Sequence, residues 1–135
     1  MRSSKLLKTG TAQADTGQTT PFTVPSYARD AIFYLDVTAL AGTTRTIDLT
    51  LNAVDSAGAS NTSNYAQFAG ITQLTAVGLV TIYAGPGITG IADDVTAHVY
   101  KLNAPLPNLM NAVLTLGRGD GDEKYTYTLT VDWMS

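Results

Sequence analysis

The C-terminal stretch from Asn111 to Trp133 constrains the fold more than any other part of this chain. From residue 125 onward, large apolar side chains alternate strictly with Thr or Asp. The apolar set is Tyr125, Tyr127, Leu129, Val131 and Trp133. A period of two predicts a β-strand with one buried face and one solvent face. Because a turn rich in Gly and Asp separates this run from the apolar run before it, the pattern predicts a β-hairpin that closes a sandwich.

Residues 31–40 and 45–53 alternate in the same way and are rich enough in β-branched and aromatic residues to be strands. Shorter strands are expected within residues 65–68, 71–83, 95–102 and 109–116, with turn residues between them. Residues 55–64 contain almost nothing that could pack, so they are expected to form a loop. With seven or eight short strands and no long helical pattern, we expect an all-β single domain, an antiparallel β-sandwich or barrel.

Composition supports one domain and restricts its chemistry. A chain of 135 residues is long enough to bury a core of its own, and without cysteine it has no disulfide, thiolate nucleophile or Cys-ligated metal. Charged residues make up 14% of the chain, well below the roughly 25% of an average domain. Because hydroxyls and amides cost less to bury than unpaired charges, such a surface suits contact with other subunits.

The first residues of the chain differ from the rest. Residues 1–20 are mostly Thr, Gln, Ser, Gly and Ala without a period of 2 or 3.6, so we expect a polar N-terminal arm over residues 1–21 and the sandwich over residues 22–135. The arm is either a frayed terminus or a segment that orders on a neighbouring subunit. Pro21 and Pro25 bracket a short extended segment. Because a proline has no amide hydrogen to donate to a sheet, we expect this segment at a sheet edge or at the start of the domain.

Arg2, Lys5 and Lys8 make this arm locally basic, although the whole chain has a formal charge of −3. An acidic chain has no general attraction to phosphate backbones, so no nucleic-acid partner is expected. The only apolar residues near the start are Leu6 and Leu7, too few for a signal-peptide core or a membrane span. We therefore expect no membrane partner.

Two motifs resemble ligand sites but are better explained as turns. Gly85, Gly87 and Gly90 satisfy GxGxxG, yet Pro86 stiffens the segment and no helical pattern follows to place a helix N-terminus against a phosphate. We expect a β-turn there.

The second motif is the tripeptide RGD from Arg118 to Asp120, flanked by glycines that a strand connection requires. Asp120, Asp122 and Glu123 could offer oxygens to Ca²⁺, but the spacing lacks the remaining ligands of a calcium-binding loop. We expect the segment to be a connection and predict no metal site.

No catalytic constellation is visible in the sequence. His98 is the only histidine, and no GxSxG elbow is present. Asp93 and Asp94 are adjacent, so on an extended chain they point to opposite faces, and we expect them to cap a turn before the next strand. The prediction is a protein that is not an enzyme, with no catalytic residues and no cofactor.

The segments RDAIFYLDVTAL and IYAGPGIT, and the closing pattern of LP, a strand, GDGD and KYTYTLTV, resemble a diverse family of small virion proteins of tailed bacteriophages. The resemblance covers roughly residues 27–131. It implies a β-sandwich or jelly-roll decoration (cement) subunit on the outer surface of the capsid. Its expected partners are the major capsid protein and, in a homotrimer, other copies of itself. The polar arm and the terminal DWMS depart from the pattern, and either could contact a neighbour by edge pairing.

On this interpretation the shell-facing residues are those of the arm, with Arg2, Lys5, Lys8, Pro21 and Phe22 as the predicted interface. One alternative is another virion component, such as a tail-tube, head–tail joining or head-fibre base protein. A further alternative is a carbohydrate-binding module in which Tyr100, Tyr125 or Trp133 supplies a stacking platform.

Overall fold

The computed structural model describes residues 2–14, 17–54, 67–88, 90, 92–94, 96–117 and 119–135. Its strands are β1 (Arg2–Gln13), β2 (Gly17–Thr23), β3 (Asp30–Ala41), β4 (Ile47–Ala53), β5 (Gln67–Leu74), β6 (Gly78–Ala84), β7 (Val99–Leu102), β8 (Leu109–Leu116) and β9 (Lys124–Met134). Within the described residues all regular structure is β, as the alternation predicted. In these ranges no helix is long and apolar enough to cross a membrane.

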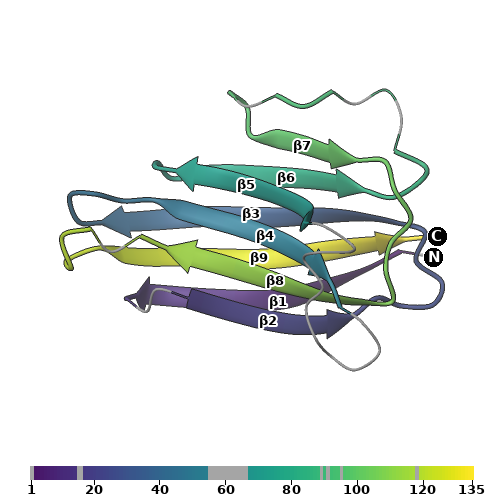
Figure 1. Ribbon diagram of the computed structural model, residues 1–135, viewed down its shortest axis with the longest axis horizontal. Helices are drawn as coiled ribbons and strands as arrows, with labels where there is room; N and C mark the ends of the chain where they lie inside the picture. The colour runs from purple at the N-terminus through teal and green to yellow at the C-terminus, as the bar shows by residue number, and fades with distance from the viewer. Residues whose placement is uncertain are drawn as a thin grey trace.

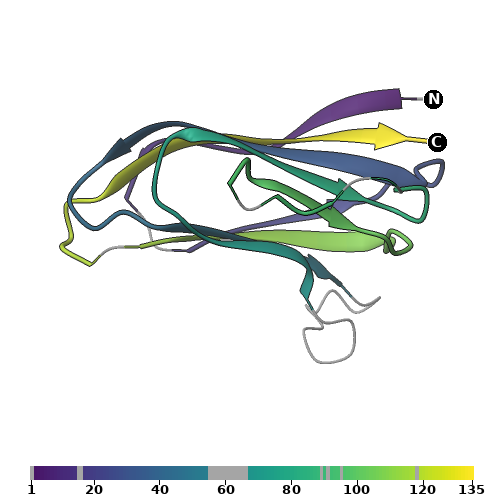
Figure 2. The same cartoon turned by 90° about the horizontal axis from the view of Figure 1, so that it is seen from above.

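The strands form two sheets that face each other as the layers of a sandwich (Figures 1 and 2). Sheet A has five strands in the order β1-β9-β3-β6-β7, and sheet B has four in the order β2-β8-β4-β5. The predicted β-sandwich is therefore confirmed.

The pairing pattern is that of a jelly roll. β1 pairs with β9, β2 with β8, β3 with β6 and β4 with β5, each pair antiparallel. The chain thus behaves as one long hairpin whose two arms are rolled together into two sheets, as in jelly rolls. β7 is an additional strand that lies parallel to β6 at one edge of sheet A.

The polar arm expected over residues 1–21 is not separate from the sandwich, so that prediction is wrong. β1 pairs with β9 from end to end, and β2 pairs with β8. Only Leu7 and Gly10 of β1 are buried. An edge strand that is exposed to solvent along most of its length does not need alternating apolar and polar side chains, because backbone hydrogen bonds to its neighbour hold it in place.

The hairpin predicted for residues 111–133 is also wrong. β8 and β9 both bury one apolar face, but β8 belongs to sheet B and β9 to sheet A. The connection between them crosses from one sheet to the other. The Tyr125 hydroxyl holds this crossover to the one between β3 and β4, because it donates to the Gly117 carbonyl at 2.7 Å and accepts from the Thr46 amide at 3.1 Å.

The predicted apolar face of β9 lies in the core. Its five residues, Tyr125, Tyr127, Leu129, Val131 and Trp133, are at most 1% exposed. The ring centroid of Phe22 in sheet B lies 6.0 Å from those of Phe33 and Trp133 in sheet A, which are 5.9 Å from each other. This aromatic cluster links the two layers.

Phe22 is therefore a core residue, 7% exposed, and its prediction as an interface residue is wrong. Alternation shows which side chains share a face, but a lone Phe between prolines carries no such information. Its neighbour Pro21 is exposed on β2, an edge strand of sheet B, as expected for a proline in a sheet.

The remaining predicted segments match in part. Residues 67 and 68 begin β5, whereas residues 65 and 66 and the expected loop at 55–64 lie outside the described residues. The expected strand in the second half of residues 71–83 is β6, and β5 ends in the first half. β7 occupies only the last four residues of 95–102.

Candidate interaction surfaces

The basic residues predicted for the interface all lie on one sheet edge. Arg2, Lys5 and Lys8 belong to β1, the edge strand of sheet A, and Pro21 belongs to β2, the edge strand of sheet B. Figure 1 shows β1 and β2 along the same side of the sandwich, and the two strands touch. We call this side the β1–β2 rim. The fold thus gathers four of the five predicted interface residues there.

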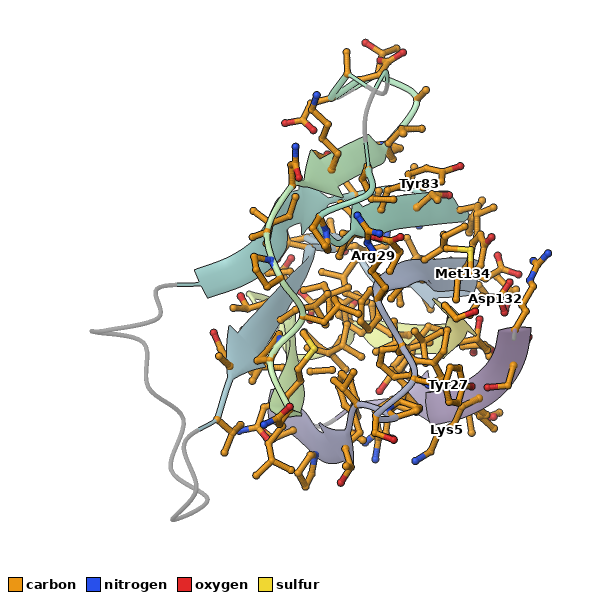
Figure 3. The ribbon with its side chains drawn as sticks, turned by 90° about the vertical axis from the view of Figure 1, so that its right-hand side faces the viewer. Lys5, Tyr27, Arg29, Tyr83, Asp132 and Met134 are labelled. Carbon is orange, nitrogen blue, oxygen red and sulfur yellow. The ribbon has the colours of Figure 1, made fainter. Side chains whose placement is uncertain are left out.

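Side chains from β1 fasten its first residues to the rest of the molecule. Arg2 Nη2 donates to Asp132 Oδ2 at 2.7 Å, and the Ser4 hydroxyl donates to the other carboxylate oxygen of Asp132. On the other face of the strand, the hydroxyls of Ser3 and Tyr27 are hydrogen-bonded. Figure 3 shows Tyr27 and Asp132 on either side of β1. We call these contacts the β1 clasp.

The β1 clasp changes the ionisation of its charged members. Hydrogen bonds from Ser4 and then Arg2 hold the pKa of Asp132 below its ordinary value. The hydrogen bond between Arg2 and Asp132 is the main cause that raises the pKa of the Arg2 guanidinium, and the negative charge of Asp132 is the second cause. The Asp132 side chain is 14% exposed and that of Arg2 66% exposed, so solvent screens the pair from one side.

A second surface is the outer face of sheet A, on which no described strand packs (Figure 2). Cross-strand pairing aligns Leu6, Thr130, Tyr34 and Thr81 in one row across four strands. Leu6 is 56% exposed, and Leu79 in a neighbouring row is 50% exposed. Large apolar and aromatic groups therefore meet solvent on this face.

The outer face of sheet A is close to neutral near Tyr34. Burial raises the pKa of Tyr34, and the nearby Asp132 and Tyr83 raise it further, so the phenol stays uncharged. The negative charge of Asp132 is paired with Arg2 in the β1 clasp. The same face carries the exposed Asp36, which lies opposite Leu79. The threonines, tyrosines and leucines around it have a low desolvation cost on contact with another protein.

The GxGxxG segment forms the predicted β-turn. The Ile88 amide donates to the Gly85 carbonyl at 3.4 Å, and Gly85 has a φ of 138° that favours glycine. The Gly87 amide donates to Asp30 Oδ1 at 2.9 Å. A phosphate placed here would meet the Asp30 carboxylate, so the local electrostatics oppose a dinucleotide.

The acidic crossover between β8 and β9 uses its carboxylates to build its own turn. The Asp120 amide donates to Glu123 Oε1 at 2.8 Å, and Thr44 Oγ1 donates to Asp120 Oδ2 at 2.6 Å. One oxygen each from Asp120, Asp122 and Glu123 lies within 4.8 Å of the others. Arg118 of the RGD tripeptide lies outside the described residues. The observed contacts are those of a connection.

The two aspartates before β7 act as turn caps, as predicted. Asp94 Oδ1 accepts the amides of Thr96 and Ala97 at 3.0 Å each, and Asp93 Oδ1 accepts the Lys101 amide at 2.8 Å. His98 follows this turn with a φ of 54° and is half-buried.

Two of the three aromatic residues proposed as a carbohydrate platform are buried. Tyr125 and Trp133 are 0% and 1% exposed, and half-buried Tyr100 packs against the core. A stacking platform must present a ring face to solvent, so Tyr125 and Trp133 do not supply one.

Sequence reasoning missed one hollow on the molecule. It has a volume of about 220 Å³ and lies between Pro21 and Thr23 of β2, Val54 and Leu109. Among the described residues that line it, none has an ionisable side chain. Of its lining residues, only Pro21 and Phe22 were singled out beforehand, because the others have no pattern that distinguishes them from ordinary strand residues.

Compared with protein-family models, curated proteins and solved structures, the chain matches none. The surfaces described above therefore carry the functional argument.

Proposed function

We propose that this protein is a non-enzymatic structural subunit of a tailed-phage virion, a decoration protein that binds the outer surface of the head and stabilises contacts between capsomers. The observation that carries the proposal is the outer face of sheet A, a sheet surface on which the apolar side chains of Leu6 and Leu79 are about half exposed. The resemblance of the strand and turn segments to small virion proteins supports it.

In this role the two surfaces have different tasks. The outer face of sheet A packs against neighbouring copies in a homotrimer, because its Thr, Tyr and Leu side chains lose little on desolvation. The β1–β2 rim contacts the major capsid protein. Each contact is modest, but repetition over a symmetric lattice raises the effective concentration of every further contact.

Sedimentation with expanded empty capsids of the parent phage tests the proposal. The wild-type protein should pellet with the capsids, and light scattering of the free protein should give the mass of a trimer. Leu79→Glu places a charge on the outer face of sheet A and should yield a monomer, whereas Asn103→Glu, at an exposed residue beyond β7, should remain a trimer.

Two outcomes would count against this proposal. A protein that stays in the supernatant at saturating concentration is not a decoration protein. Hexameric rings in solution would favour the alternative, a tail-tube, head–tail joining or head-fibre base protein, over a trimeric capsid subunit.

A further inference from the structure

The edge of sheet A formed by β1 is the longest of the four sheet edges in the described residues. The edges are β1 and β7 in sheet A and β2 and β5 in sheet B. β7 has only 4 residues, and β2 contains Pro21, which has no amide hydrogen to donate. β1 has 12 residues and no proline. An unprotected edge presents amide and carbonyl groups to which another strand can pair.

The regular part of this edge is its first half. Arg2 to Leu6 pair without interruption with Met134 to Thr130, and the first register shift comes between Leu6 and Lys8. A second shift follows between Gly10 and Gln13. Because bulges bend a strand and interrupt its ladder, an added strand would pair with residues 2–6.

The same residues are held in place by the β1 clasp. Arg2 and Ser4 hydrogen-bond to Asp132 on one face, and Ser3 hydrogen-bonds to Tyr27 on the other. A terminal strand without such contacts frays and must be ordered when a partner binds. The clasp supplies that order in advance, which favours binding.

The charge of β1 indicates the kind of partner. The strand carries Arg2, Lys5 and Lys8 and no acidic residue, whereas the rest of the chain has five basic against eleven acidic residues. Arg2 is paired with Asp132, but within the described residues neither Lys5 nor Lys8 has an ion-pair partner. Figure 3 shows Lys5 projecting from β1 away from the sandwich.

We propose that the β1 edge binds an extended acidic segment of a partner protein, which adds to sheet A as a further strand along residues 2–6. Backbone pairing supplies the affinity, and Lys5 and Lys8 select acidic side chains. A second copy of β1 is a poor occupant, because like charges would then face each other across the new strand pair. The proposal does not depend on the proposed capsid role, in which the segment would belong to the capsid protein.

A synthetic peptide tests the proposal on the full-length protein. The probe is a fluorescein-labelled peptide of alternating Glu and Val, and its fluorescence anisotropy gives the Kd. One control peptide has Lys in place of Glu. Another keeps the Glu residues but is N-methylated at alternate amides, so that it cannot form a ladder. Only the unmodified acidic peptide should bind, and amide hydrogen exchange of residues 2–6 should slow in its presence.

Charge-reversed variants locate the site. Lys5→Glu combined with Lys8→Glu should raise the Kd of the acidic peptide about tenfold, because each reversal removes one exposed charge pair and adds a repulsion. Lys101→Glu combined with Lys124→Glu changes the net charge equally at exposed residues outside β1 and should leave the Kd within about twofold.

The proposal is overturned if the acidic peptide fails to bind at millimolar concentration. Equal binding of the N-methylated peptide would also overturn it, because attraction would then be electrostatic without strand addition. Equal losses in the two double variants would place the peptide elsewhere. Since no capsid enters the experiment, failure here is distinct from failure to sediment with capsids.

Discussion

Replacing Gly10 with Ala tests whether β1 is packed into the sandwich. Gly10 lies opposite Tyr127 in the β1–β9 ladder. A Cβ at residue 10 would be 2.6 Å from Cε1 and 2.9 Å from Cζ of the Tyr127 ring. Because that ring is 1% exposed, it has no free space into which to move. Overpacking of this kind costs about 1–3 kcal/mol. For a domain of this size, each kcal/mol lowers Tm by about 4 °C.

Urea unfolding followed by the fluorescence of Trp133, the only tryptophan, measures the effect. Gly17→Ala is the matched control, because a Cβ on that β2 residue meets nothing within 4 Å. Its free energy of unfolding should stay within about 0.5 kcal/mol of wild type. In a Tyr127→Leu background, where the opposing side chain is shorter, Gly10→Ala should cost less than it does in the wild type. Equal stability of the two glycine variants would refute the packing of β1 against Tyr127.

Three further predictions concern residues of known environment. Tyr125→Phe removes the hydroxyl that bridges two crossovers and should lower the free energy of unfolding by about 1–3 kcal/mol. Tyr127→Phe should leave the free energy of unfolding unchanged or raise it, because the Tyr127 hydroxyl is buried and has no hydrogen-bond partner in the described part of the chain. Chemical denaturation of the two variants compares these effects, and equal losses would contradict the assignment. Phe22→Ala should cost about 3–5 kcal/mol in thermal or urea unfolding, and a cost as small as that of Pro21→Ala would place Phe22 outside the core. Because the folded-state pKa of Asp132 lies below its ordinary value of 3.8, its stabilising effect is present above that value and is lost as the pH falls through the folded-state pKa. The stability difference between wild type and Asp132→Asn should therefore shrink below about pH 4, and a difference that is constant with pH would disprove the role of the β1 clasp.

The core could be predicted where side chains alternate. Tyr125, Leu129 and Trp133 were assigned to the buried face of a strand, and they are buried. Alternation works for β9 because sheet B covers its whole inner face. It fails for β1, where 10 of the 12 residues from Arg2 to Gln13 are exposed or half-buried on a rim and only the backbone ladder gives order. Edge strands of this kind leave little trace in a hydrophobic pattern.

The neighbours of a strand were harder to predict than its faces. β8 and β9 have the alternation and the Gly-rich connection of a hairpin, yet they lie in different sheets. A hairpin and a crossover both present one apolar face to the core, so the pattern is the same for either. What distinguishes them is long-range pairing, such as that of β8 with both β2 and β4.

The candidate site was predicted in part. The sequence marked the basic residues Arg2, Lys5 and Lys8, and the fold places them along one edge. The β1 clasp could not be predicted, because Asp132 is separated from Arg2 by 130 residues and from Ser4 by 128. Only closure of the jelly roll, which pairs the first strand with the last, brings these groups together.

The two proposed surfaces have opposite physical character, and this makes their roles separable. The outer face of sheet A is mainly uncharged and exposes Leu6 and Leu79, so it favours copies of the same chain, whereas the basic edge of β1 repels another copy and attracts an acidic strand. Leu79→Glu should therefore abolish self-association and leave binding of the acidic peptide intact. Lys5→Glu with Lys8→Glu should do the reverse. If either change removed both activities, one surface would be serving both, and the division of roles between the face and the edge would be wrong.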